Sequence, residues 1–110
     1  MRSLPLVVLF VSVLAFAVSG TFRGYLAEDP VPDGAKRWVY LESRNGSVRR
    51  VEISHAALSY GEEVRQKRHP ENASDGLRKG AGIRVTASQD ESGEWEASTV
   101  EIIEMPPSQE

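Results

Sequence analysis

The sequence predicts one all-β domain, a five-stranded sheet curled into a small barrel, behind an N-terminal targeting segment. Three observations predict this class. Two segments in the last third alternate apolar and polar residues with the two-residue period of strands. Asn45-Gly46 separates two segments rich in β-branched and aromatic residues, and an apolar run from Leu4 to Val18 follows Met1-Arg2-Ser3. The 110 residues suffice for one modest core but not for two domains.

Residues 1–20 have the layout of a secretory signal peptide: a positive start, an apolar run and small residues. Cleavage after Gly20 or after Ala17 would suit a signal peptidase. The apolar run of ~15 residues is shorter than the ~20 that a membrane-spanning helix needs. The alternative is an uncleaved anchor helix. Both alternatives export the domain, residues 21–104, to the periplasm or the extracellular space, with membrane contact only through the leader.

The first strand is predicted from Thr21 to Leu26, where apolar and polar side chains alternate. Gly24 inside it indicates a bulge or a sharp bend. The stretch from Glu28 to Gly34 is rich in residues that interrupt strands, so we expect a loop there.

Strands two and three are predicted at Trp38 to Glu42 and Val48 to Ile53, joined by a tight turn at Asn45-Gly46. This dipeptide is the strongest short signal for a hairpin. Asn45 and Asn72 also begin acceptor triplets for N-glycosylation, which matter only if the source is a eukaryote.

The connector from Ser54 to Lys79 is the least predictable segment. Ala56 to Leu58 could begin a helix, or Leu58 to Tyr60 could be a short strand. One helical turn is predicted within Glu71 to Lys79, with Leu77 pointing inward. This connector therefore carries a short helical turn between the third and fourth strands.

The fourth strand is predicted at Ile83 to Ala87, followed by a turn at Asp90 to Gly93 and a long strand from Glu94 to Glu104. In that last strand the apolar residues change from odd to even positions. A two-residue period cannot change phase without an extra residue, so a bulge is predicted near Ser98-Thr99. Residues 105–110 are predicted to be a disordered tail.

Three strands, a mixed connector and a closing hairpin form the layout of the OB-fold, a partly open five-stranded barrel. The sequence thus predicts an OB-like barrel over residues 21–104.

Residues 77–104 resemble a known kind of domain, in addition to showing the alternation of strands. Leu77 to Ala87, Asp90 to Gly93, Trp95 to Ala97 and Val100 to Ile102 together resemble the closing strand pair of small exported bacterial OB-fold domains, whose functions are mostly uncharacterised. The resemblance implies a fold and a compartment but no activity. The periplasmic haem chaperone of cytochrome c maturation shares the general layout. It carries a haem-attaching histidine after the last strand, where this chain has Glu104 to Pro107, so haem attachment is not expected.

Composition excludes several kinds of chemistry. The chain has no cysteine, which rules out disulfides, thiolate metal sites and cysteine nucleophiles. Its two histidines, His55 and His69, have no partner histidine at close spacing, so no metal site is predicted. A formal net charge of −3 is untypical of general nucleic-acid binders. No cofactor and no catalytic residue is predicted.

One group of basic and aromatic residues is a candidate for ligand binding. The candidate ligand-binding residues are Trp38, Tyr40, Arg44, Arg49, Arg50, Arg65, Lys67 and Arg68. OB-folds bind oligonucleotides and oligosaccharides on the face of strands two and three, with aromatic rings for stacking. The alternative is that Trp38 or Tyr40 belongs to the core and the arginines keep the hairpin soluble.

These observations favour a non-catalytic binding module of the cell envelope that holds an anionic glycan, another anionic polymer or a protein ligand. One alternative is an accessory protein that docks onto a larger envelope assembly. Another is a protein that binds single-stranded nucleic acid.

Overall fold

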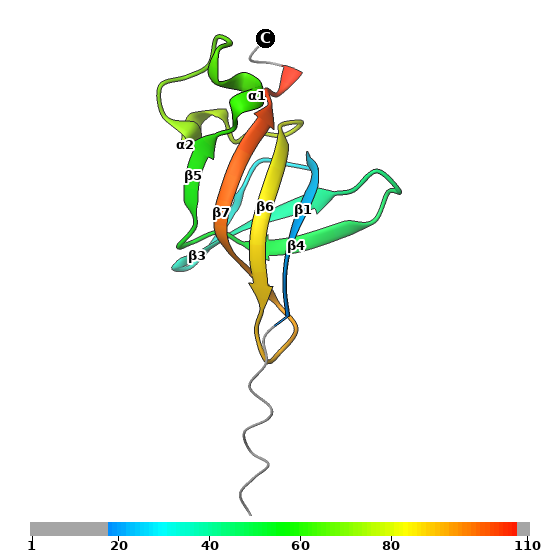
Figure 1. The fold of residues 1–110 in the computed structure, drawn as a ribbon. Helices are drawn as coiled ribbons and strands as arrows, with labels where there is room; N and C mark the ends of the chain where they lie inside the picture. Colours follow the sequence, from blue (N-terminus) through cyan, green and yellow to red (C-terminus); the bar gives the residue numbers. More distant parts are fainter. Residues whose placement is uncertain (1–17, 108–110) are drawn as a thin grey trace, which may run out of the picture.

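A closed barrel of five strands forms the centre of the computed structural model, which describes residues 18–107 (Figure 1). The elements are β1 (Val18–Leu26), β2 (Val31–Asp33), β3 (Lys36–Glu42), β4 (Val48–Glu52), β5 (Ala57–Tyr60), α1 (Glu62–Arg65), α2 (Ala73–Gly76), β6 (Gly82–Gln89) and β7 (Trp95–Glu104). The predicted all-β class and the five-stranded barrel are confirmed. The predicted signal or anchor helix falls mostly on residues 1–17, which lie outside the described residues, and its last three residues belong to β1.

Closure depends on β1, which has two partners. It pairs antiparallel with β6 along most of its length and with β3 at its end, where Tyr25 faces Glu42 and Leu26 faces Leu41. The order β1-β6-β7-β4-β3 therefore returns to β1. The β4–β7 pair is parallel, whereas the other neighbours in this ring are antiparallel. Closing the sheet in this way removes most of the exposed strand edge.

Gly24 lies where β1 passes from β6 to β3. A Cβ atom at this position would lie 2.6 Å from the carbonyl oxygen of Glu42 and 2.9 Å from Cγ of Leu41. Only glycine allows the two backbones to come so close. The pairing of β1 with β6 is continuous from Val18 to Tyr25, so of the two predicted alternatives the bulge is wrong.

Strand β7 contains two irregularities. Thr86 faces Thr99 while Ala87 faces Ala97, which leaves Ser98 as the extra residue and confirms the predicted bulge. A second irregularity, which was not predicted, leaves Ile103 as an extra residue opposite β6: Ile83 faces Ile102 and Gly82 faces Glu104. The first keeps Ala97, Val100 and Ile102 in the core, and the second places Ile103 and Glu104 together on the outside.

The core fills the inside of the barrel. Its buried cluster is Leu26, Val39, Leu41, Val51, Ile53, Val64, Leu77, Ala81, Ile83, Val85, Ala87, Ala97, Val100, Ile102 and Met105. The predicted disordered tail is wrong for its first residues, because Met105 is only 5% exposed and Pro106 is fully buried. These apolar side chains remain with the barrel because leaving it would return their surface to water. Residues 108–110 lie outside the described part of the chain.

The loops differ from expectation in detail. The turn at Asn45-Gly46 is wider than a two-residue turn: the amide of Ser43 donates to Ser47 O and that of Gly46 to Ser43 O. The side-chain oxygen of Asn45 accepts bonds from Ser43 and Ser47, and Gly46 has a φ of 90°. This is a three-residue hairpin loop with its glycine in the left-handed region.

The predicted loop from Glu28 to Gly34 contains the short strand β2, which pairs with β3. In the connector the strand alternative is confirmed, because β5 pairs in parallel with β7. The expected helical turn is α2, followed by buried Leu77, and α1 is an additional turn. Figure 1 shows both short helices near the end of β7 where the chain finishes.

Candidate functional site

The predicted binding residues lie in three places. Trp38, Tyr40, Arg49 and Arg50 are on β3 and β4; Arg44 is at the tip of their hairpin; Arg65, Lys67 and Arg68 are in the connector at α1 or just after it. The structure thus does not join the eight residues into one patch.

Trp38 is on the outer side of β3 but is covered. Its side chain is only 5% exposed, and the Arg50 guanidinium lies 4.0 Å from the ring centroid, with the Lys36 ammonium at 5.7 Å. Arg50 is held there by Glu94 across a distance of 2.6 Å. The indole face is therefore already stacked on cations and is not a free platform for a ligand ring.

Arg49 and Arg50 point to opposite sides of β4, because consecutive residues of a strand do so. The Arg49 guanidinium lies 4.1 Å from the ring centroid of Phe22 and 5.5 Å from that of Trp95. The two rings meet edge to face at 5.0 Å. Arg49 thus packs on two aromatic rings on the core-facing side of β4, and it does not share a surface with Arg50.

The connector cations lie apart from the hairpin. Arg65 donates to the carbonyl of Tyr60 at 3.3 Å and lines a hollow with Glu62, Glu63, Arg84 and Glu101. Lys67 and Arg68 are exposed in the following loop. Acidic side chains dominate this hollow, so it does not extend a basic patch from the hairpin.

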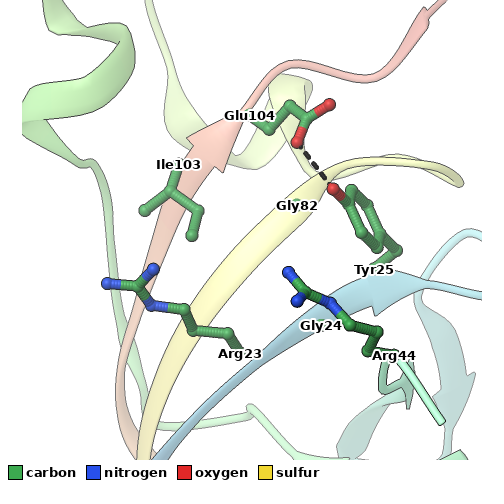
Figure 2. Close-up of a pocket in the computed structure, with 7 residues that line it drawn as sticks. All are labelled: Arg23, Gly24, Tyr25, Arg44, Gly82, Ile103 and Glu104. Atoms are coloured by element: carbon green, nitrogen blue, oxygen red, sulfur yellow. Dashed lines mark hydrogen bonds between the residues drawn. The ribbon is translucent and has the colours of Figure 1, made fainter.

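Arg44 reaches into a different hollow, on the outer side of β1, β6 and β7 (Figure 2). This hollow has a volume of about 360 Å³, and its lining residues are Arg23, Gly24, Tyr25, Arg44, Gly82, Ile103 and Glu104. Figure 2 shows Arg44 and Tyr25 on one side of it and Arg23 and Ile103 on the other. We call it the arginine hollow.

The local sequence builds the arginine hollow in three ways. Alternation along β1 places Arg23 and Tyr25 outward on either side of Gly24. The irregularity at Ile103 turns two successive residues of β7 outward, a known use of bulges. Gly82 has no side chain to fill the hollow, and a Cβ atom at this position would lie only 2.8 Å from Cβ of Glu104.

The charged side chains of the hollow differ in whether they form ion pairs or hydrogen bonds. Within residues 18–107, neither Arg23 nor Arg44 forms an ion pair or a side-chain hydrogen bond. Tyr25 donates its hydroxyl to Glu104 at 2.8 Å. This hydrogen bond, and then the charge of Glu104, raise the pKa of Tyr25. The hollow therefore offers two available guanidinium groups beside an acceptor carboxylate.

Arg84 provides the contrast. It faces Arg23 across the β1–β6 pair but is bound to Glu63 at 2.8 Å and to Glu101 at 2.7 Å. The hydrogen bond to Glu63, and then that to Glu101, raise the pKa of Arg84, and Arg84 in turn lowers the pKa of Glu63. Arg84 is thus neutralised by two carboxylates, whereas Arg23 beside it forms no ion pair within residues 18–107, although its charge also helps to lower the pKa of Glu63.

Of the residues that line this hollow, only Arg44 was predicted from the sequence. Arg23 and Tyr25 were recognisable as the outward residues of the first strand, but nothing in the sequence places the hairpin tip beside them. Ile103 and Glu104 depend on a bulge that the apolar pattern did not reveal.

The fold and the site together define the class of this protein. It is a small closed β-barrel with a surface hollow lined by arginine side chains. The chain matches no protein-family model, and no curated protein matches its sequence. Within residues 18–107, every helix is too short or too polar to cross a membrane.

Proposed function

We propose that this chain is an exported, non-catalytic binding module with an OB-like fold, and that it holds the acidic group of a ligand in the arginine hollow. The strand order around the barrel, with the connector placed before the closing β6–β7 hairpin, supports the OB-like assignment. The observation that carries the binding proposal is the pair Arg23 and Arg44, two guanidinium groups at the edge of one hollow that form no ion pair with any residue from 18 to 107.

The chemistry of the lining favours an anionic glycan. Guanidinium groups bind carboxylate and sulfate oxygens through paired hydrogen bonds. The Glu104 carboxylate can accept a bond from a sugar hydroxyl, and Ile103 offers an apolar surface to a sugar ring. A hollow with cations, one acceptor and one apolar wall suits an acidic sugar better than a bare phosphate chain.

Single-stranded nucleic acid is less well supported. Binding without sequence preference depends on aromatic side chains on which bases stack. Of the two candidates for that role, Trp38 is covered by Arg50 and Lys36, and Tyr40 is half-buried.

The proposal predicts that Arg23→Ala with Arg44→Ala weakens binding of a short heparin oligosaccharide at least about tenfold, because each charge-assisted hydrogen bond contributes about 1.5–3 kcal/mol. Isothermal titration calorimetry at moderate salt measures this. The matched control is Lys67→Ala with Arg68→Ala, which removes the same charge from exposed connector positions and is expected to change the affinity less than threefold.

Equal losses in both double variants would show that the binding depends only on net charge, which contradicts the proposal. Co-purification of an envelope protein that survives the Arg23 and Arg44 substitutions would instead favour the docking role.

Export makes a separate prediction about the mature N-terminus. Strand β1 begins at Val18, where Val18 to Gly20 pair with residues of β6. Cleavage after Ala17 leaves these pairs intact, whereas cleavage after Gly20 removes them. We therefore expect the exported protein to begin at Val18 when its intact mass is measured. A mature protein that begins at Thr21, or retains residues 1–17, would contradict this.

A further inference from the structure

Two carboxylates lie side by side where β4 and β7 run in parallel. Glu52 and Glu96 are direct partners in that pairing, and each projects to the outer side of its strand, since their neighbours Val51, Ile53 and Ala97 are buried. Like charges directly opposite each other on one sheet face destabilise the pair. A cation between the two side chains would remove this cost.

No arginine or lysine of residues 18–107 forms an ion pair with either carboxylate. The imidazole of His55 lies beside them, with its Nδ1 3.8 Å from Oε2 of Glu96. Arg50, which is on the same face of β4 as Glu52, is occupied by Glu94. Among the described residues, the two carboxylates therefore have the His55 imidazole beside them and form no ion pair with a stronger base.

The fold holds these three groups in place. A turn after β4, in which the Ala56 amide donates to Ile53 O at 3.1 Å, sets the backbone at His55. The hydroxyl of Ser54 donates to Oε2 of Glu52 at 3.0 Å and accepts from the backbone amide of Arg37 at 2.9 Å. Glu52 is thus oriented by a hydrogen bond from outside the trio, as carboxylates that bind metals commonly are.

The ligand atoms of Glu52, His55 and Glu96 all lie within 4.8 Å of one another. Ligand distances of about 2.0–2.2 Å would require them to close to about 3.4 Å in a tetrahedral site. Half-buried Glu52 and exposed His55 and Glu96 can make that adjustment by small rotations. Three protein ligands would leave a position for water, as in open zinc sites.

We propose that Glu52, His55 and Glu96 form a surface site for a divalent transition-metal ion, with Zn²⁺ as its representative. One imidazole nitrogen and two carboxylates select such ions over Ca²⁺ and Mg²⁺, which prefer oxygen ligands alone. The ion would balance the two negative charges that the β4–β7 register brings together. The site shares no residue with the arginine hollow and does not depend on the proposed binding function.

The test is calorimetric titration of the purified, tag-free protein with ZnCl₂, and separately with CaCl₂ and MgCl₂. We expect one Zn²⁺ per chain, with no comparable binding of the other two ions. His55→Ala and Glu96→Gln should each weaken Zn²⁺ binding at least about tenfold, since even outer-shell changes cost about 10- to 100-fold. His69→Ala is the matched control, because it removes the other histidine, which stacks on Tyr60.

Circular dichroism checks that each variant remains folded, and the imidazole signals of the unsubstituted protein report the site by NMR. Zn²⁺ should shift the His55 signals and leave those of His69 unchanged. Absence of Zn²⁺ binding, equal weakening by His69→Ala, or a shift at His69 alone would overturn the proposal. So would unchanged affinity in His55→Ala, and Ca²⁺ binding as tight as that of Zn²⁺.

Discussion

Ile102→Ala is expected to lower the free energy of unfolding by about 2–5 kcal/mol, the usual cost of truncating a buried isoleucine. Ile102 is 1% exposed and faces Ile83 across the β6–β7 pair at the centre of the core. A small domain has only about 5–15 kcal/mol of stability in total, so this one change removes a large fraction of it. Urea unfolding followed by circular dichroism measures the loss.

The adjacent isoleucine provides the control. Ile103 is the extra residue at the second irregularity of β7 and lies on the outer side, along the arginine hollow. Ile103→Ala removes the same atoms and should cost about 1 kcal/mol. Equal losses of unfolding free energy in the two variants would contradict the placement of Ile102 in the core and Ile103 on the outer side of β7.

Gly24→Ala is the second change with a large expected effect. A methyl group at this position would meet the carbonyl oxygen of Glu42 at 2.6 Å, and backbone cannot move aside as a flexible side chain can. We expect a loss of about 1–3 kcal/mol or more, and increased hydrogen exchange at the amides that join β1 to β3. Thermal unfolding and amide exchange measured by NMR test both effects.

Gly20→Ala is the matched control on the same strand. The nearest atom to a Cβ there is Cε1 of Phe22 at 4.0 Å, an ordinary contact. The stability should change by no more than about 1 kcal/mol, because the added methyl group makes only this ordinary contact and nothing has to move. A Gly24→Ala protein as stable as Gly20→Ala would contradict the closure of the barrel at β1 and β3.

Strands whose own residues alternate between apolar and polar could be predicted from the sequence. The phase change in β7 required an extra residue, and Ser98 is that residue. The connector could not be predicted in the same way. Strand β5 exists because it pairs in parallel with β7, a contact between distant segments, and α1 is a single turn with Val64 buried against the barrel. Met105 and Pro106 follow the last strand and are buried, which no strand pattern in their own residues indicated.

The candidate site could be predicted only in part, because it too depends on contacts between distant segments. Alternation correctly placed Trp38 and Tyr40 on one face of their strand, but it could not show that Arg50 and Lys36 cover the indole. Arg44 was selected for its charge and its place in a hairpin turn. Its neighbours Arg23 and Tyr25 come from β1, and only the closure of the sheet brings them to the same hollow.

The most direct test of the account is NMR mapping of where an acidic sugar binds. A heparin oligosaccharide is titrated into ¹⁵N-labelled protein, and the signals of the arginine side chains and of the Trp38 indole are followed. We predict saturable shifts of the Arg23 and Arg44 Nε–H signals and of amides near Tyr25 and Ile103, with the Trp38 indole unchanged. Shifts centred on Trp38 and Arg50, or on Lys67 and Arg68, would contradict a ligand site in the arginine hollow.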